Sequence, residues 1–268
     1  MSLNDPSSWT ELAEELKSIS LPYFKKHNQW YEDNGLPRNP NQCQRIYPSP
    51  YLNIYHYPLE IDYIDLRPNP PNWLRMDTFM IKSNEEFVIP EKLKKLPGKL
   101  IYFSLGSIIS RDIDVMKKLV NYLSSSPHRF IVSKGMFGEE YDLPDNCWGQ
   151  NSVPQTAVLK VVDLVLIHGG NNSLCEVFYY GKPMIVMPVF ADQPDNAQRV
   201  QEKGFGIRIN PYDCSKDELL NAIEKLANDQ ELFKKMKLIA GRCERESNSN
   251  KIVNMVEQVV VKAKNYSI

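Results

Sequence analysis

The chain has 268 residues, of which 42% are hydrophobic and 24% are charged, the composition of an ordinary globular domain. Its 32 basic and 33 acidic residues leave a formal net charge of −1, so charge alone points to neither nucleic acid nor an anionic membrane surface as a partner. No apolar run is long enough to span a bilayer, so we expect no membrane segment in this chain.

The first third of the chain is irregular. About half of the 19 prolines lie at or before Pro71, whereas all but one of the 12 glycines lie at or after Gly98. A capping box at Ser8 predicts a helix to about Ser18. The pattern further predicts a helix over Tyr23–Asn34, strands over Leu52–Tyr57 and Tyr63–Leu66, and a stiff turn at Pro68, Pro70 and Pro71. Because no strand–helix–strand unit occurs here, we interpret this part as an irregular helical remnant of another domain.

Strands and helices alternate from Lys99 onward. Apolar runs predict five strands, over Leu100–Leu105, Phe130–Val132, Asp163–Ile167, Pro183–Met187 and Phe205–Ile209. Helical stripes and a second capping box predict helices over Asp112–Leu123, Thr156–Val162, Ser173–Tyr180, Gln193–Glu202, Ser215–Asn228, Gln230–Arg245 and Ile252–Lys262. This alternation predicts an α/β fold with a doubly wound, Rossmann-like parallel sheet.

Two features bear on the compartment. Met1–Thr10 lacks the basic start and the apolar core of a secretory signal. The five cysteines are odd in number, widely spaced and without a C-x-x-C pair: Cys43, Cys147, Cys175, Cys214 and Cys243. This pattern favours free thiols over a disulfide framework or a zinc site, so we expect a cytoplasmic protein without a bound metal.

Ligands of doubly wound sheets bind at the carboxyl ends of the strands. Four stretches with polar residues or glycines fall at such ends, namely Gly106-Ser107, Asn151–Gln155, His168–Ser173 and Asp192-Gln193. In the third stretch, glycines allow close backbone approach, and the free amides of a helix start favour an anion such as pyrophosphate. Glu176, one turn into that helix, suits a pair of ribose hydroxyls, and Asp192 and Gln193 suit sugar hydroxyls.

Each of these residues also has a plainer interpretation. His168 can be a structural histidine after a strand, Gly169-Gly170 a simple turn, and Glu176 a solvated helix residue. Asn171-Asn172-Ser173 is formally an N-glycosylation sequon. Ser173 with His168 suggests a nucleophile pair, but no G-x-S-x-G motif is present. The ligand site is favoured because all these residues fall at successive strand ends of one sheet.

A series of short motifs runs in order between about Leu100 and Gln201: Val153-Pro154-Gln155, His168-Gly169-Gly170, Asn172-Ser173, Glu176, Gly181-Lys182-Pro183-Met184, Met187-Pro188 and Asp192-Gln193. This series resembles the signature of the UDP-glycosyltransferases, family 1 with the GT-B fold. The stretch Leu52–Met80 is similar to the segment before the donor domain in invertebrate members. The resemblance implies a UDP-sugar donor-binding domain over residues 91–268, preceded over residues 1–90 by a linker and a remnant of the acceptor domain.

The resemblance also implies an activity and a role for each residue. The activity is inverting transfer of a hexose from a UDP-sugar, a co-substrate rather than a cofactor, to a small lipophilic acceptor. The diphosphate is then held by His168, Gly170, Asn172 and Ser173, with Ser107 near the phosphates. In the same resemblance, Glu176 binds the ribose hydroxyls, Gln155 and the backbone of Val153 contact the uridine, and Asp192 and Gln193 bind the sugar.

The chain departs from the family pattern in two ways. Many members stack uracil on a tryptophan two residues before the Pro-Gln pair, where this chain has Ser152, with Trp148 nearby; plant members have tryptophan where Asn171 stands. The general-base histidine and its aspartate partner belong to an N-terminal Rossmann domain that no stretch here resembles, since His27 and His56 lie in other contexts. We therefore expect no catalytic residue in this chain.

These departures leave several functions open. The chain is a donor-binding fragment of a glycosyltransferase whose acceptor contacts lie in a missing N-terminal domain, a natural half-enzyme that needs a partner subunit, or a non-catalytic UDP-sugar-binding module. A GT-B nucleotide-sugar epimerase is a further alternative, against which the series from Pro154-Gln155 to Asp192-Gln193 argues.

Overall fold

The computed structural model describes residues 7–36, 38, 48–77, 84–245 and 249–265. Backbone contacts divide the chain into two compact units, Met1–Asn53 and Ile54–Ile268, each of which is described by itself. The predicted functional boundary at residue 90 stays a prediction. Cys43 lies outside the described residues, and the other four cysteines are buried free thiols.

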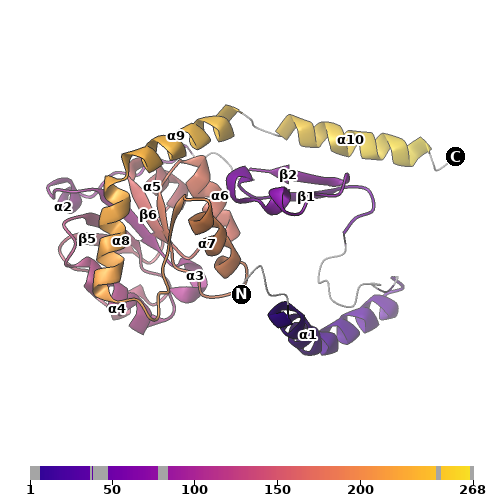
Figure 1. Cartoon of the computed structure of the whole chain (residues 1–268), viewed down its shortest axis with the longest axis horizontal. Coiled ribbons are helices and arrows are strands. Elements are labelled where there is room, and N and C mark those ends of the chain that lie inside the picture. The colour runs from indigo at the N-terminus through magenta and orange to yellow at the C-terminus, as the bar shows by residue number, and fades with distance from the viewer. Residues whose placement is uncertain (1–6, 37, 39–47, 78–83, 246–248, 266–268) are drawn as a thin grey trace. The chain divides into compact units, whose positions relative to one another are not determined.

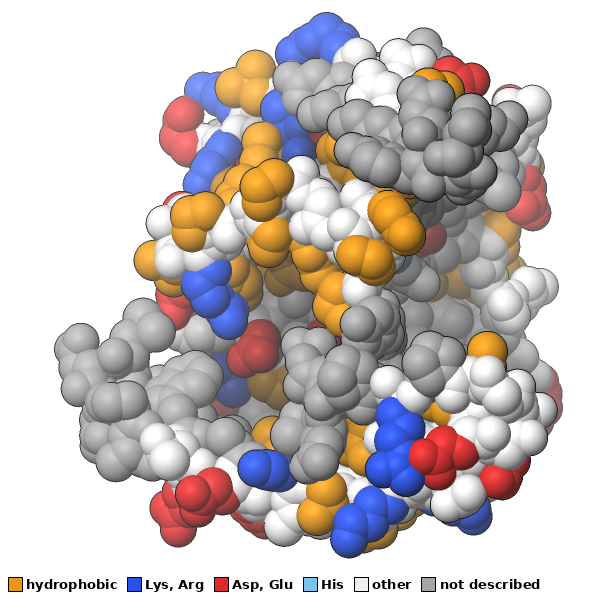
Figure 2. All heavy atoms as spheres, turned by 90° about the vertical axis from the view of Figure 1, so that its right-hand side faces the viewer, with side chains coloured by type: hydrophobic (Ala, Val, Ile, Leu, Met, Phe, Trp, Pro, Cys, Tyr) orange, Lys and Arg blue, Asp and Glu red, His pale blue; other side chains and the backbone are white. Residues whose placement is uncertain are grey.

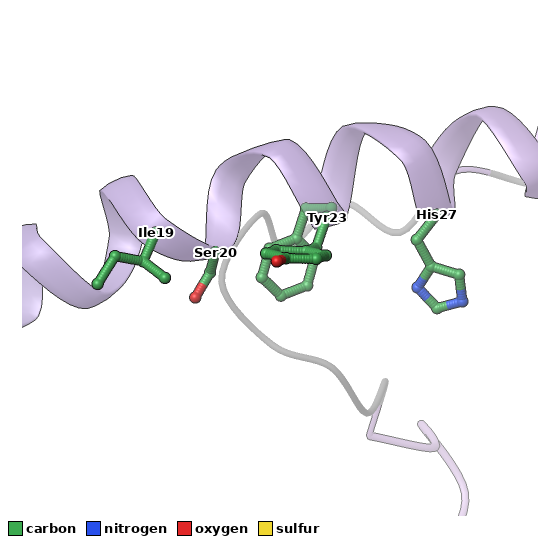
Figure 3. A pocket seen from close by; sticks show the side chains of 5 residues that line it. Ile19, Ser20, Tyr23 and His27 are labelled. Carbon is green, nitrogen blue, oxygen red and sulfur yellow. The ribbon is translucent and has the colours of Figure 1, made fainter.

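The first unit is built on one long helix, α1 (Ser7–Asp33), with Pro22 inside it. The prediction of two separate helices is therefore wrong. Proline removes one backbone hydrogen bond and bends a helix without always ending it, and α1 bends along its length in Figure 1. Ile19, Tyr23 and His27 follow one another at four-residue spacing and line a hollow of about 320 Å³ together with Ser20 and Phe24 (Figure 3). None of the predicted site residues lines this hollow.

The second unit contains a six-stranded sheet in the order β5-β4-β3-β6-β7-β8, and every pairing in it is parallel. Its strands are β3 (Leu100–Ser104), β4 (Arg129–Ser133), β5 (Cys147–Gln150), β6 (Leu164–Ile167), β7 (Met184–Val186) and β8 (Gly206–Arg208). The predicted doubly wound parallel sheet is thus confirmed. Strand β5 was not predicted, because its four residues include Gly149 and show no β-branched run.

Helices surround this sheet (Figure 1). They are α2 (Glu91–Lys94), α3 (Gly106–Ile109), α4 (Ile113–Leu123), α5 (Gln155–Val161), α6 (Asn171–Tyr179), α7 (Gln193–Glu202), α8 (Lys216–Asn228) and α9 (Gln230–Arg245), with the 3₁₀ helix η3 (Gly138–Glu140). Helix α10 (Ser249–Asn265) follows α9 in the chain. All seven helices expected after Lys99 are present, whereas the single-turn α2 and α3 were not expected. As the capping box predicts, the Ser215 side chain accepts a hydrogen bond from the Glu218 amide at 3.1 Å.

The core lies around the two central strands, because every residue of β3 and of β6 is buried. Tyr102, Phe103, Phe130 and Phe178 are among its largest buried side chains. Burying such strands on both faces fixes the positions at which they end. Among the described helices, none is both long and apolar enough to cross a membrane.

Residues 54–77 form a separate layer of the second unit. Strand β1 (Asn53–His56) pairs with β2 (Trp73–Met76), and the 3₁₀ helices η1 (Leu59–Ile61) and η2 (Tyr63–Asp65) lie between them. The strand predicted over Tyr63–Leu66 is wrong, since the amides of Leu66 and Arg67 fold back onto the Tyr63 carbonyl. Strand β2 was missed because it follows three prolines that we interpreted as a linker.

Two buried or half-buried arginines fasten this layer to the helices. The Arg199 guanidinium of α7 donates to the carbonyls of Ile61 and Asp62 and pairs with Asp65. Arg242 of α9 pairs with Glu60 at 2.9 Å and with Asp77 at 2.8 Å. Burial raises the pKa of the Asp77 carboxyl, but the hydrogen bonds from Arg242 and Arg75 outweigh it and hold that pKa below the usual value. Residues 54–77 are therefore positioned against the sheet and its helices.

Candidate functional site

The direction in which the chain adds strands reverses between β3 and β6. From β3 the chain moves outward to β4 and β5, and it then returns to place β6 on the other side of β3. The last residues of the two central strands, Ser104 and Ile167, are register partners. The loops that follow them start side by side, and this switch point of a doubly wound sheet is where a ligand is expected.

The His168 ring lies between two glycines at this switch point. A Cβ at Gly106 would lie 2.8 Å from His168 Cε1, and a Cβ at Gly170 would lie 2.6 Å from Nε2. Gly106 also has a φ of 72°, in the left-handed region that favours glycine. Both glycines are therefore needed to seat the ring.

His168 is half-buried, and within the described residues one of its ring nitrogens has no partner. Its Nδ1 atom is buried and has no hydrogen-bond partner among the described residues. Burial lowers the pKa of His168, and the Asp192 carboxylate and the Ser104 backbone oppose that shift. In the ligand-free protein the imidazole is thus favoured in its neutral form, and an added negative charge nearby would favour the protonated form.

Helix α6 begins directly after this histidine and has no side-chain cap, because Gly170 occupies the N-cap position. The Asn171 amide donates to Asp192 Oδ2 at 3.1 Å, and the Leu174 amide donates to the Gly170 carbonyl at 3.0 Å. Within the described structure, the amides of Asn172 and Ser173 between them have no partner. Two adjacent free amides at the positive end of a helix dipole suit an anionic ligand.

Gln155, Ser173 and Glu176 form one hydrogen-bonded cluster across two helices. Gln155 Nε2 at the start of α5 donates to Glu176 Oε2 and, at 3.2 Å, to Ser173 Oγ. Burial raises the pKa of Tyr102 to about 12, so its hydroxyl remains a donor and reaches Gln155 Oε1 at 3.2 Å. Burial also raises the pKa of Glu176, and the Gln155 amide opposes that shift. Among the described residues, the Glu176 carboxylate therefore accepts a hydrogen bond from the Gln155 amide and can accept further ones.

Asp192 and Gln193 hold the loop before α7. Asp192 Oδ2 accepts from the Asn171 amide and, at 2.9 Å, from Asn196 Nδ2. Gln193 is 4% exposed, and its Oε1 accepts from the Val189 and Phe190 amides at 3.0 and 3.2 Å. Ala191, in the same loop, has a φ of 58°, which is a strained conformation for a residue with a side chain. These contacts give Asp192 and Gln193 a structural role. Their contact with a sugar stays a prediction.

The other predicted residues lie at the same edge of the sheet. Ser107 is exposed on the first turn of α3, and Val153 is buried just before α5. No described hydrogen bond joins Ser107 to the rest of the site. Ser152 is exposed, and Trp148 packs against Phe87 with ring centroids 5.7 Å apart, so neither side chain is identified as a platform for a base.

Sequence reasoning missed three residues that the fold brings to the site. His56 Nε2 lies 2.7 Å from Asn172 Oδ1, and the His56 carbonyl accepts from Asn171 Nδ2 at 2.9 Å. The Tyr57 hydroxyl donates to Asn196, whose Nδ2 reaches the Gly169 carbonyl at 2.8 Å. The contacts of His56 and Tyr57 each span more than a hundred positions, so no local pattern signals them.

The charges of the described surface are mixed. On the face shown in Figure 2, Lys and Arg side chains lie among Asp and Glu side chains, as the near-zero net charge leads one to expect. Within the described ranges, no three His, Cys, Asp or Glu side chains lie close enough together to hold a metal ion. The chemistry of the site therefore has to be argued from its amides, His168 and the Glu176 cluster.

Sequence comparison connects this arrangement with a known group of enzymes. The family described as UDP-glucoronosyl and UDP-glucosyl transferase matches residues 97–242, more than half of the chain. UDP-glucuronosyltransferase 2A2 of Mus musculus is 26% identical over 254 residues, a match that covers 85% of this chain and 44% of the relative. NDP-glycosyltransferase YjiC of Bacillus subtilis is 31% identical over 141 residues, covering 52% of this chain and 36% of the relative. The chain thus spans less than half the length of these curated relatives.

Solved structures show the same fold. The glycotransferase of kitacinnamycin superposes with a TM-score of 0.75 at 21% identity, covering 93% of this chain and 65% of that one. CalG4, the calicheamicin glycosyltransferase, superposes with a TM-score of 0.70 at 17% identity, covering 98% of this chain and 68% of that one. At these identities the superpositions support the GT-B-type α/β architecture.

Proposed function

The chain belongs to the UDP-glucuronosyl and UDP-glucosyl transferase family, and on that premise we propose that it binds a UDP-sugar at the carboxyl edge of its sheet. The observation that carries the proposal is the pair of free amides at the start of α6, next to the buried and unpartnered Nδ1 of His168. Backbone amides at a helix start that have no acceptor of their own suit a diphosphate. In this proposal Gly170 and Ser107 also lie near the phosphates.

The Glu176 cluster supports the nucleoside half of this ligand. Partial burial raises the pKa of the Glu176 carboxyl, which accepts one described hydrogen bond, from the Gln155 side-chain amide. A ribose supplies two hydroxyl donors, which would satisfy the carboxylate and favour its ionised form. Gln155 and the backbone of Val153 then face the uracil, and Asp192 and Gln193 face the hexose.

Held this way, the donor is prepared for an inverting transfer. An acceptor hydroxyl attacks the anomeric carbon, the bond from that carbon to the diphosphate oxygen breaks, and UDP leaves with the extra negative charge. The α6 amides and a protonated His168 stabilise that charge where it develops. We assign no residue of this chain as the base that accepts the hydroxyl proton.

The proposal extends to what the chain lacks for transfer. Its four histidines are each placed elsewhere: His27 on α1, His56 against Asn172, His128 before β4, and His168 beside the proposed diphosphate site. A small lipophilic acceptor and the base are then supplied by a further domain or a partner subunit. A non-catalytic UDP-sugar-binding module is the alternative, and the same arrangement of histidines favours it equally.

Calorimetric titration of UDP against Glu176→Ala tests the site. Each hydrogen bond from a ribose hydroxyl to a charged carboxylate is worth about 1.5–3 kcal/mol, so the variant should lose at least tenfold in UDP affinity. Because a buried carboxyl is removed, its Tm should not fall. Glu231→Ala, which removes an exposed glutamate on α9, is the matched control and should bind as the parent does. Equal affinity of the two variants would contradict the assignment.

A transfer assay with radiolabelled UDP-glucose and a panel of phenolic acceptors separates the remaining alternatives. The chain alone should bind donor and form no glycoside, since no base lies within about 2.6–3.2 Å of an acceptor hydroxyl. Glycoside formed by the chain alone, and abolished by changing one of its four histidines, would show that it carries its own base. Glycoside formed only after a partner is added would identify a half-enzyme, and no product under any condition would identify a binding module.

A further inference from the structure

The end of strand β1 lies against the start of helix α6, although the two are more than a hundred residues apart in the chain. His56 contacts both asparagines there: its Nε2 lies 2.7 Å from Asn172 Oδ1, and its carbonyl accepts from Asn171 Nδ2 at 2.9 Å. His56 is half-buried, whereas the Asn172 side chain is exposed at the mouth of the site. One residue of the preceding layer thus holds the first turn of the helix on which the proposed diphosphate site is built.

The pairing decides which way the Asn172 amide faces. A side-chain amide has one oxygen, which accepts, and one NH2 group, which donates. The imidazole presents Nε2 to the oxygen, so the ring donates and the NH2 group is turned away from His56. Without the ring, the oxygen would be free to turn toward the unpaired amides of Asn172 and Ser173, where it would compete with an anion.

We infer that His56 is a positioning residue of the donor site, which orients Asn172 so that its NH2 group adds a donor to the diphosphate cradle. The inference rests on the proposed function, and it makes His56 part of the donor site.

The next residue offers a matched control. The Tyr57 hydroxyl donates to Asn196, which in turn holds the Gly169 carbonyl and Asp192. Tyr57 therefore fastens the same strand to the same loop without facing Asn172. Tyr57→Phe tests attachment of the strand, and His56→Ala tests orientation of the amide.

The experiment compares UDP with uridine, which lacks the diphosphate. His56→Ala should bind UDP at least tenfold more weakly than the parent, the effect of one lost hydrogen bond to a charged group, and should bind uridine unchanged. His56→Gln should regain most of the UDP affinity, because its Nε2 can donate from a similar position. Tyr57→Phe should lower the Tm and leave the ratio of UDP to uridine affinity at the parental value.

A double-mutant cycle completes the test. If His56 acts through Asn172, then adding His56→Ala to Asn172→Ala should cost no further UDP affinity. Parental UDP affinity in His56→Ala, or an equal loss for UDP and uridine, would overturn the inference while leaving the proposed function in place. A parental chain that binds neither UDP nor UDP-glucose would overturn the proposed function and the inference with it.

Discussion

The two edges of the parallel sheet use polar groups in opposite ways. At the amino edge, Lys182 Nζ donates to the Val162 carbonyl at 2.8 Å, Asp163 Oδ2 accepts from the Leu100 amide at 2.8 Å, and His128 Nδ1 accepts from the Lys99 amide at 3.1 Å. At the carboxyl edge, His168 Nδ1 and the amides of Asn172 and Ser173 have no protein partner in the described structure. The first edge joins neighbouring segments of the fold, whereas the second carries the proposed ligand site, so substitutions at the two edges should separate stability from binding.

Asp163→Ala should give the largest effect and should act on stability alone. The substitution leaves the Leu100 amide of a buried strand unpaired and removes the negative neighbour of the half-buried Lys182, whose pKa is already lowered by burial. The free energy of unfolding should fall by about 2 kcal/mol in urea titration. UDP affinity should stay at the parental value under conditions where the variant is folded.

Asp163→Asn is the control for that change. It keeps an oxygen for the Leu100 amide and should recover about half of the loss. A variant that lost UDP affinity with an unchanged free energy of unfolding would break the separation between the two edges.

The pH dependence of donor binding should report His168. Burial lowers its pKa in the free protein, and a bound diphosphate raises it by placing negative charge beside the ring. The complex then binds more protons than its free components, so affinity rises as the pH falls. UDP-glucose is the right ligand, because its diester phosphates stay ionised. From pH 8 to pH 6 its affinity should rise, and His168→Gln should flatten the curve. A flat curve for the parent would place the diphosphate away from the ring.

The same reasoning gives His128 an effect on stability at the amino edge. Burial lowers its pKa, with Lys99 acting in the same direction and with Glu224 and Asp163 opposing. Below the ordinary histidine pKa of about 6.5 the unfolded chain therefore binds more protons than the folded one, so stability present above that pH is lost as the pH falls. Urea titrations between pH 7.5 and pH 5.5 should therefore show the free energy of unfolding falling as the pH falls, with His168 contributing in the same direction. His128→Asn, whose oxygen can replace Nδ1, should reduce that slope and leave the pH curve of UDP-glucose affinity unchanged.

Asp192→Asn should give the smallest effect. It tests whether Asp192 only stabilises its loop or also contacts the hexose. The variant keeps an oxygen for the Asn171 amide but loses the charge at the helix start, so stability should fall by only about 0.5 kcal/mol. UDP-glucose affinity should fall about threefold while UDP affinity does not, if the carboxylate faces the hexose. Equal changes in UDP-glucose and UDP affinity would show that Asp192 has only a structural role.

The sequence predicts the sheet better than it predicts the site. Apolar runs such as Leu164–Ile167 predict buried strands, because both faces of a parallel sheet are apolar. The glycines around His168 likewise indicate that backbone and ring approach each other closely. Sequence patterns do not predict the Cys147–Gln150 strand or the 3₁₀ turns at Tyr63, because the conformation of such short elements is set by contacts with neighbouring elements rather than by residue propensity.

Contacts within the site depend on distant parts of the chain. That His56 meets Asn172 follows only from the folded arrangement of β1 and α6. Likewise, sequence assigns Gln193 to a ligand by its place after a strand, yet its oxygen is occupied by the amides of its own loop. Local pattern identifies the edge of the sheet where a site lies, and tertiary packing decides which atom of each side chain remains available.

The arginine anchors of residues 54–77 have a consequence for synthesis. Glu60 meets Arg242, which is translated 182 positions later, and Asp65 meets Arg199 134 positions later. At about 5–20 residues per second, the layer waits on the order of ten seconds or more after leaving the ribosome before its partners exist. The layer is therefore translated before the helices that carry its arginine partners, and its ion pairs with Arg242 form only once α9 brings that residue to Glu60 and Asp77.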